Sequence, residues 1–328
     1  MSANLHSFSK PGHNVAVLGG LGFIGSHICR RLVADGYAVR IFDKLYASHK
    51  LVEDIEKEVE IIEGDISRPQ DVLNVIANAD MLIHLVHTTV PGSSMVDPAY
   101  DLVSNVSASA NWLRRLSETG LHRIFYVSSG GTVYGIPRRN PIGEDHPTNP
   151  INSYGITKLA IEKYISMYAS MFDIECRLLR PSNVYGPGQR LGIGQGVIGV
   201  LADRALRGEP LEIWGTGENL RDYLYVEDMV SALMGLLNYT GHHQIFNVSS
   251  GRGHSVLDIV AVLRDQLAYE PEVIYQPDRG FDVNVNVLDS SLLHAETGWR
   301  PVVDLEEGIA RTLQWMKSRP GRVDVERA

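Results

Sequence analysis

Near its beginning the chain reads Val15-Ala16-Val17-Leu18-Gly19-Gly20-Leu21-Gly22-Phe23-Ile24-Gly25, an apolar run followed by closely spaced glycines. The apolar run predicts a buried strand, and the periodic apolar residues of Ile24–Ala34 predict a helix directly after it. Glycines in this context let the backbone approach a pyrophosphate, whose charge meets the free N–H groups and positive end of the helix. The context therefore indicates a dinucleotide-binding loop, with cofactor-binding residues Gly19, Gly22, Phe23, Ile24 and Gly25.

Nearby residues narrow the type of nucleotide. Gly20 and Gly25 also have the spacing of a phosphate-loop NTPase, but Ser26 stands where that loop requires lysine, which excludes an ATPase. Asp43 ends the second apolar run, roughly 20 residues beyond the loop, where a carboxylate accepts hydrogen bonds from the adenosine ribose and repels a 2′-phosphate. This favours NAD, but Lys44 could receive that phosphate, so NADP stays open.

Strand-like and helical patterns alternate through the first half of the chain. Continuous apolar runs predict strands at Val15–Leu18, Val39–Phe42, Val59–Ile62, Met81–Leu85, Ile124–Val127 and Arg177–Leu179. Helical periodicity between them predicts helices at Ile24–Ala34, Val72–Ala77, Tyr100–Leu116 and Tyr154–Met171. Alternating units of this kind predict an α/β fold with a doubly wound parallel sheet of the Rossmann type.

After Arg180 the sequence becomes rich in glycine and proline. The stretch Tyr185–Gln189 and the glycines at 192, 194, 196 and 199 predict loops over a ligand. Further helices are predicted at Asp228–Leu237, Val256–Gln266 and Leu305–Trp315, and short strands at Ile245–Val248 and Val273–Tyr275. We expect a smaller, interleaved C-terminal substrate lobe: residues 1–180 and 222–250 form the dinucleotide-binding domain, and residues 181–221 and 251–328 form the lobe.

Composition limits the class of protein. With 328 residues, 44% of them hydrophobic and 21% charged, the chain can bury a large core, and disorder is excluded. The net charge of −9 opposes binding to nucleic acid or anionic lipid. Cys29 and Cys176 are too few for a disulfide framework and indicate a reducing compartment. No long apolar run occurs, and Met1–Gly12 lacks a secretory signal, so we expect a cytoplasmic protein without a membrane span.

Tyr154 and Lys158 form the candidate proton-transfer pair. They are four residues apart at the start of a helix, so their side chains can act on one ligand. A free tyrosine has a pKa near 10, so a base at neutral pH needs its phenolate stabilised by roughly 4 kcal/mol; an ammonium about 5 Å away supplies roughly 3 kcal/mol, and a positive nicotinamide ring the rest. Tyr46 and Lys50 share the spacing, but only Tyr154 follows the fifth strand, at the edge where such sheets bind ligands.

At this point the residues resemble the extended short-chain dehydrogenase/reductase superfamily, and within it the NAD-dependent sugar-nucleotide epimerases and dehydratases, similar to UDP-glucose 4-epimerases. The resemblance runs nearly from end to end. Its further motifs are Gly64-Asp65-Ile66, His84-Leu85-Val86, Ser128-Ser129-Gly130-Gly131-Thr132-Val133-Tyr134-Gly135, Tyr154-Gly155-Ile156-Thr157-Lys158, Arg180-Pro181-Ser182-Asn183, Arg221-Asp222-Tyr223, Phe246-Asn247-Val248-Ser249-Ser250-Gly251, and Arg279 before Asp282.

The resemblance implies NAD as cofactor and assigns roles. Tyr154 acts as the base, and Lys158 binds the nicotinamide ribose and tunes Tyr154. The cofactor-binding set gains Asp43, Asp65, Ile66, Leu85 and Val86. The nucleotide diphosphate of a UDP- or dTDP-hexose substrate is held by Asn183, Arg221 and Arg279. Guanidinium groups suit phosphate oxygens, although arginines also form surface ion pairs.

One departure from the family concerns the catalytic hydroxyl. In UDP-galactose 4-epimerases a Ser or Thr stands three positions before the Val of Val-Tyr-Gly and shares the hydrogen bond of the sugar hydroxyl with Tyr. Here that position is Gly130, so Ser129, Thr132 or a water takes over the hydrogen bond. Those epimerases also carry a lysine near Thr89, which is absent here, so strict UDP-galactose specificity is not expected.

Three functions remain open. The leading one is NAD-dependent 4-epimerisation of a nucleotide-activated hexose through a transient 4-keto intermediate, with a role in polysaccharide biosynthesis. The second is an NAD(P)H-dependent 4-ketoreductase of a nucleotide-linked deoxysugar, which uses the same residues. The third is a catalytically silent dinucleotide-sensing scaffold, which the intact Tyr154/Lys158 pair disfavours. The helices Tyr100–Leu116 and Tyr154–Met171 resemble those that pair subunits of this family, so a homodimer is expected.

Other chemistries are disfavoured. The segment from Gly130 to Thr132 lacks the Thr-Asp-Glu-type acid pair of 4,6-dehydratases, which argues against dehydration and decarboxylation. His84 and His87, three apart on a predicted strand, are expected to point to opposite faces, so no metal site is predicted. No Gly-x-Ser-x-Gly elbow is present for a hydrolase.

Overall fold

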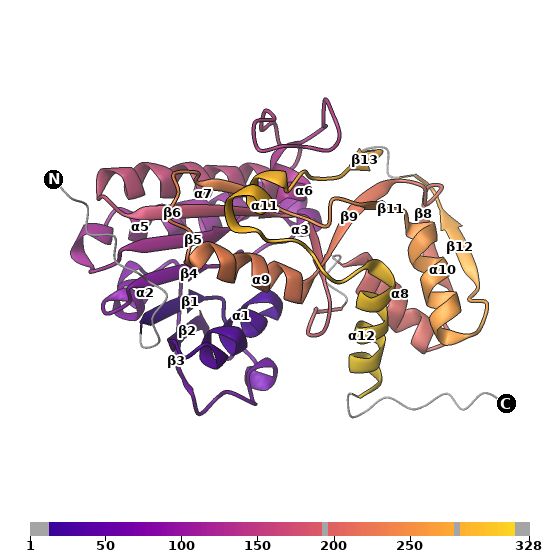
Figure 1. The fold of residues 1–328 in the computed structure, drawn as a ribbon, viewed down its shortest axis with the longest axis horizontal. Coiled ribbons are helices and arrows are strands. Elements are labelled where there is room, and N and C mark those ends of the chain that lie inside the picture. Colours follow the sequence, from indigo (N-terminus) through magenta and orange to yellow (C-terminus); the bar gives the residue numbers. More distant parts are fainter. Residues whose placement is uncertain (1–12, 192–195, 279–282, 319–328) are drawn as a thin grey trace.

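The computed structural model describes residues 13–191, 196–278 and 283–318, and its largest element is a seven-stranded parallel sheet (Figure 1). The strands lie in the order β10 (Ile245–Val248), β6 (Glu175–Pro181), β5 (Arg123–Val127), β4 (Met81–His84), β1 (Asn14–Leu18), β2 (Ala38–Lys44) and β3 (Val59–Gly64). The strand order reverses between β1 and β4, as in doubly wound sheets. The predicted fold class is confirmed.

Helices cover both faces of the large sheet, because alternate residues of each strand point to opposite faces. Val15 and Val17 of β1 pack with α1 (Phe23–Ala34) and α9 (Val226–Leu237). Ala16 and Leu18 belong to the opposite cluster, which includes residues of α2 (Pro69–Ile76), α5 (Ala108–Leu113) and α7 (Ser153–Met171). Burial on both faces explains why the strands read as continuous apolar runs.

A second group of elements has a core of its own. Its helices α8 (Val197–Leu206), α10 (Val256–Leu267) and α12 (Leu305–Lys317) pack on one another beside β8 (Leu211–Trp214) and β12 (Val273–Gln276). A small sheet contains β7 (Asn183–Tyr185), β9 (Leu220–Tyr225), β11 (Gly253–His254) and β13 (Val285–Asn286). Late in the chain, α11 (Ser291–Thr297) returns to the large sheet, where it contacts β10 and α9.

The helix predicted at Tyr100–Leu116 is interrupted. The chain forms α4 (Pro98–Asp101), the π-helical segment η2 (Leu102–Ser107), α5 and the 3₁₀ turn η3 (Leu116–Glu118). Nδ2 of Asn105 donates a 3.0 Å hydrogen bond to the carbonyl oxygen of Asp101, an acceptor that a regular helix would use for its own backbone. A side chain in competition with the backbone explains the widened turn.

The loop prediction after Arg180 is only partly right. Gly199 lies inside α8 rather than in a loop, whereas Gly196 precedes that helix with φ +84°. Gly192 and Gly194 lie outside the described residues. The remaining short elements are η1 (His49–Leu51), α3 (Pro91–Val96) and α6 (Gly130–Val133). Within the described ranges, none of the helices combines the length and the apolar character that a membrane span requires.

Candidate active site

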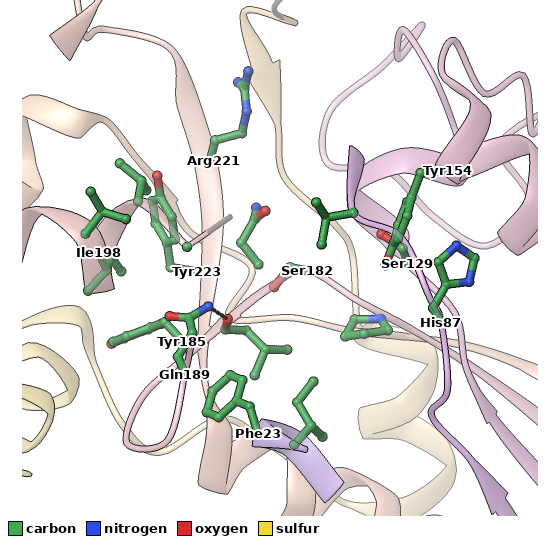
Figure 2. A pocket seen from close by; sticks show the side chains of 18 of the residues that line it. Phe23, His87, Ser129, Tyr154, Ser182, Tyr185, Gln189, Ile198, Arg221 and Tyr223 are labelled. Carbon is green, nitrogen blue, oxygen red and sulfur yellow. Dashed lines mark hydrogen bonds between the residues drawn. The ribbon is translucent and has the colours of Figure 1, made fainter. Parts of the chain in front are cut away.

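A pocket of about 760 Å³ lies between the two groups of elements. One side follows the carboxyl ends of the parallel strands, with Gly19 after β1, Leu85 after β4 and Ser129 after β5. Figure 2 shows Ser129, Tyr154 and His87 facing Ile198 and Tyr223 across the pocket. Doubly wound sheets bind their ligands at this edge, so the pocket is the candidate active site.

The glycine loop has the geometry that a dinucleotide needs. Gly19 adopts φ +89°, and its carbonyl oxygen accepts a 3.1 Å hydrogen bond from the N–H of Gly22. A Cβ on Gly25 would lie 2.1 Å from that oxygen and 2.8 Å from Cα of Gly20, so no side chain fits between loop and helix. Gly22 has no side chain to cap α1, whose first N–H groups therefore suit a pyrophosphate. All five residues predicted for the loop line the pocket, and they fit the cofactor.

Asp43 lies beside this loop, although it is not among the residues that line the pocket. Its Oδ2 accepts a 3.1 Å hydrogen bond from the N–H of Leu21, and its Oδ1 accepts one of 2.9 Å from the N–H of Lys44. The carboxylate is thus held against the loop at the end of β2. This is the position from which it can meet an adenosine ribose.

The other residues predicted to bind the cofactor are distributed unevenly. Leu85 lines the pocket, whereas Val86 and Ile66 pack against the core cluster that contains Trp112. Asp65 follows β3, and its Oδ1 accepts a 2.9 Å hydrogen bond from the N–H of Ser67. The structure therefore brings Leu85 to the pocket and leaves Asp65, Ile66 and Val86 outside its lining.

Tyr154 and Lys158 both line the pocket. The side chain of Asn152 caps α7 by accepting a 2.8 Å hydrogen bond from the N–H of Gly155, which starts the helix one residue before Tyr154. One turn later, Nζ of Lys158 donates a 2.9 Å hydrogen bond to the carbonyl oxygen of Val127 and lies 5.7 Å from the centroid of the Tyr154 ring. The competing residue Tyr46 is 94% exposed and lies outside the pocket lining.

Burial changes the proton affinity of both groups. Burial raises the pKa of Tyr154 well above its usual range, and the charge of Asp101 raises it further. Burial lowers the pKa of Lys158 to about 7, against the opposing effect of Glu162 and Asp101. The attraction between ammonium and phenolate is therefore opposed by desolvation, which disfavours both charged forms and which the spacing of the two residues in the sequence does not reveal.

The two candidate hydroxyls are not equivalent. Ser129 lines the pocket next to Tyr154 (Figure 2), whereas Thr132 lies outside the lining. A Cβ at Gly130 would lie 2.3 Å from Cδ1 of Leu288 and 2.9 Å from the carbonyl oxygen of Arg180, so a Ser or Thr does not fit there. Ser129 is the hydroxyl in the better position.

The predicted substrate-binding residues come from the far side of the pocket. Asn183 and Arg221 both line it. Nδ2 of Asn183 donates a 2.9 Å hydrogen bond to the carbonyl oxygen of Asp222, and Nη1 of Arg221 donates one of 3.0 Å to the carbonyl oxygen of Leu220. Arg279 lies outside the described residues.

Several lining residues were missed by the sequence analysis. They include His87, Thr89, Gln189, Trp214, Asn219 and Tyr223. For His87 and Trp214 the available signal was position: His87 closely follows a strand end, and Trp214 ends β8 just before Gly215. Tyr223 and Gln189 lie in stretches that the sequence analysis quoted but gave no role, and the other four residues belong to no motif.

The argument from strand alternation was wrong for one histidine, because β4 ends at His84 and His87 lies beyond it. His84 is buried between Trp112 and Tyr126, with ring centroids 5.6 and 5.1 Å away. His87 enters the pocket instead. Among the described residues, no three His, Cys, Asp or Glu side chains are grouped so that they could hold a metal ion.

Comparisons with known proteins add independent information. Residues 15–249 match the model of the NAD dependent epimerase/dehydratase family. A putative UDP-glucose 4-epimerase of Methanocaldococcus jannaschii is 35% identical over 307 residues, which is 93% of this chain and 98% of the relative. A dTDP-4-dehydro-6-deoxyglucose reductase of Escherichia coli is 31% identical over 313 residues, 94% and 98% of the two chains. The crystal structure of Thermotoga maritima UDP-glucose 4-epimerase with UDP-glucose superposes with a TM-score of 0.87 at 32% identity, covering 93% of this chain and 98% of that one.

Proposed function

Because the chain belongs to the NAD-dependent epimerase/dehydratase family, we propose that it catalyses 4-epimerisation of a nucleotide-activated hexose, of the UDP-glucose/galactose type or a related sugar. One observation carries the proposal: Tyr154, Lys158 and Ser129 line the same pocket as the glycine loop. A sugar hydroxyl held there meets a base, a second hydroxyl and the cofactor at once. The family and the pocket both support NAD as that cofactor.

NAD held at the glycine loop would supply a hydride acceptor and then a hydride donor for C4, and the flat 4-keto sugar turns over between the two transfers. Oη of Tyr154 takes the O4 proton as the hydride leaves and returns it when hydride adds to the opposite face, so protons and electrons balance over one turnover. Oγ of Ser129 shares the hydrogen bond to O4. The protonated form of Lys158 places a positive charge beside Tyr154 and so opposes the effect of burial on the phenolate.

We assign the two parts of the chain to the two ligands. Residues 1–180 and 222–250 bind the dinucleotide, through the glycine loop, Leu85 and Lys158; Asp43, Asp65, Ile66 and Val86 complete the cofactor site at the neighbouring strand ends. Residues 181–221 and 251–328 bind the sugar nucleotide, with Asn183, Arg221 and Arg279 at its diphosphate. The lining of the pocket by residues of both parts supports this division.

A 4-ketoreductase of a nucleotide-linked deoxysugar is the second candidate. The observation that favours it is the similarity of the whole chain to a dTDP-4-dehydro-6-deoxyglucose reductase. The same Tyr154 would then donate a proton to the C4 oxygen while the reduced cofactor donates hydride. The reductase consumes NAD(P)H, whereas the epimerase regenerates its NAD.

We further propose a homodimer built on η2 and α7, which contact each other. Large apolar side chains are exposed on this surface and its edges: Tyr100, Leu102, Val103, Ile156, Tyr164 and Met167. A patch of this kind is typical of a protein–protein interface. Buried free thiols at Cys29 and Cys176 support a cytoplasmic enzyme, and a nucleotide sugar as product would suit polysaccharide biosynthesis.

The test is incubation of the purified protein with UDP- and dTDP-hexoses without added cofactor, with NMR identification of the products. A C4 epimer is the expected product. If no sugar changes, yet a 4-keto-6-deoxy nucleotide sugar consumes added NAD(P)H, the reductase replaces the epimerase.

Variants test the assigned roles in the same assay. Tyr154→Phe is expected to lower kcat by about 10²–10⁴-fold. Tyr275→Phe, which changes an exposed tyrosine outside the pocket, is the matched control. Ser129→Ala is expected to lower kcat more than Thr132→Val; equal losses would contradict the assignment of Ser129.

A further inference from the structure

His87 is a buried histidine in the pocket that the mechanism above does not use. Its side chain is 5% exposed, and its ring stands edge-on to the Tyr154 ring, with the centroids 4.5 Å apart (Figure 2). Nδ1 is buried and has no hydrogen-bond partner within the described part of the chain. A buried acceptor or donor without a partner is costly unless a ligand completes it.

The opposite nitrogen, Nε2, faces two hydrogen-bond acceptors. It lies 3.5 Å from Oδ1 of Asp101 and 3.5 Å from Oγ1 of Thr157. The single proton of the Thr157 hydroxyl is directed to Oδ2 of Asp101, 3.1 Å away, or to the carbonyl oxygens of Ser153 and Tyr154. Nε2 therefore carries the ring proton, which leaves a lone pair on Nδ1.

Asp101 is held as a carboxylate by its surroundings. Burial acts to raise its pKa, but hydrogen bonds from His87, Ser153 and Thr89 outweigh that effect and keep the pKa below its usual range. Burial and the charge of Lys158 lower the pKa of His87 to about 4, against the opposing effect of Asp101, so the ring is neutral near neutral pH. A neutral ring with its proton on Nε2 presents an acceptor at Nδ1.

We infer that Nδ1 of His87 accepts a hydrogen bond from a hydroxyl group of the ligand beside Tyr154, and that Asp101 is the positioning residue that keeps the proton on Nε2. The donor is a sugar hydroxyl, either of the hexose substrate or of the nicotinamide ribose. This identification rests on the proposed function. A phosphate is excluded as the partner, because its oxygens and Nδ1 are all acceptors. The contact orients the ligand toward Tyr154, since the two rings touch.

Two variants separate this role from a purely structural one. His87→Asn keeps an acceptor near the position of Nδ1 and loses the group at Nε2. His87→Gln reaches the position of Nε2, so it keeps a donor to Asp101 and loses the acceptor. We expect His87→Gln to lower kcat/KM about tenfold or more, mainly through KM, and His87→Asn to retain the greater part of the activity. Activity retained by His87→Gln and lost in His87→Asn would overturn the proposal. It would mean that His87 acts only by holding Asp101 in place.

The second readout is the ¹⁵N NMR signal of the His87 ring in the holoenzyme, assigned by its loss in His87→Gln. We expect an unprotonated Nδ1 in every state and the shift of a hydrogen-bonded acceptor once the hydroxyl is present. Spectra of the holoenzyme alone, with UDP and with UDP-glucose identify the source. A hydrogen-bonded signal before UDP-glucose is added points to the ribose, and one that appears only with UDP-glucose points to the hexose.

A protonated Nδ1, or an Nδ1 that is never hydrogen-bonded, would overturn the proposal. Asp101→Asn supplies an amide donor opposite Nε2, so it is expected to move the ring proton to Nδ1 and to raise KM; thermal unfolding shows whether that variant folds. The spectra do not depend on turnover. If the spectra show a hydrogen-bonded Nδ1 but the epimerase assay yields no C4 epimer, the proposed function is rejected. The hydrogen bond of His87 to a ligand hydroxyl then still stands.

Discussion

Cδ1 of Leu288 occupies the space that a side chain at Gly130 would need, since a Cβ there would lie 2.3 Å from it. The carbonyl oxygens of Arg180 and Pro181, at 2.9 and 3.2 Å, close the other sides. Gly130→Ser should therefore not restore the catalytic hydroxyl that the family resemblance led us to expect at this position. We expect it to lower the free energy of unfolding by about 1–3 kcal/mol, through overpacking, and to lower activity.

Gly131→Ser is the matched control for this change. Its Cβ would meet nothing closer than Oδ1 of Asn183 at 3.8 Å. Urea unfolding of the two variants should show the larger loss for Gly130→Ser. Equal stability of the two would show that Leu288 and the backbone around it move aside at little cost.

Asp43 should set the preference between NAD and NADP. In Asp43→Asn the amide oxygen can still accept the hydrogen bond from the N–H of Leu21, so the glycine loop keeps its contact. The charge that repels a 2′-phosphate is lost, and we expect the ratio of the NADPH to the NADH dissociation constant to fall about tenfold. Fluorescence titration with the two reduced cofactors measures this ratio. Lys44→Gln tests the alternative that Lys44 binds the 2′-phosphate of NADPH. If it does, this variant should bind NADPH more weakly.

Glu162 and Arg180 form a buried ion pair, and their side chains are 1% and 2% exposed. Nε and Nη2 of Arg180 donate hydrogen bonds of 3.1 and 2.7 Å to the two carboxylate oxygens. Glu162→Gln removes the counter-charge of a buried guanidinium, so we expect a loss of about 3–5 kcal/mol in the free energy of unfolding. The double variant Glu162→Leu/Arg180→Met should lose less than the sum of its single variants. Additive losses in denaturant unfolding would mean that the two side chains do not stabilise each other.

His84 should make the fold sensitive to acid. Both ring nitrogens are buried without a hydrogen-bond partner among the described residues, and burial lowers the pKa of His84 to about 3. The unfolded chain binds this proton near its ordinary pKa of about 6.5, so stability is lost as the pH falls below that value toward the folded pKa. Between pH 7 and 5 the loss from this residue is about 2 kcal/mol. In His84→Phe the same change of pH should cost less by that amount; an unchanged pH dependence would show that His84 is not the sensor.

The large sheet could be predicted because its strands are buried on both faces, so β1 reads as four apolar residues in a row. The strand β9 reads Leu-Arg-Asp-Tyr-Leu-Tyr and shows no such run. It forms because β7 and β13 pair with it from distant parts of the chain. The π-helical turn around Asn105 could not be predicted from the sequence either, because the choice between a regular and a π-helical turn depends on one side-chain hydrogen bond.

The sequence by itself determined the features that depend only on residues close together in the chain. These are the glycine loop before α1 and the placement of Tyr154 and Lys158 on one face of α7. Helix and turn geometry repeat over a few residues, so spacing alone is sufficient for these. Only the tertiary structure decided that Ser129 rather than Thr132 lines the pocket, that Leu288 fills the space at Gly130, and that His87 meets Tyr154, 67 positions away. Burial and contacts between distant segments depend on the packing of the whole chain, which no local spacing records.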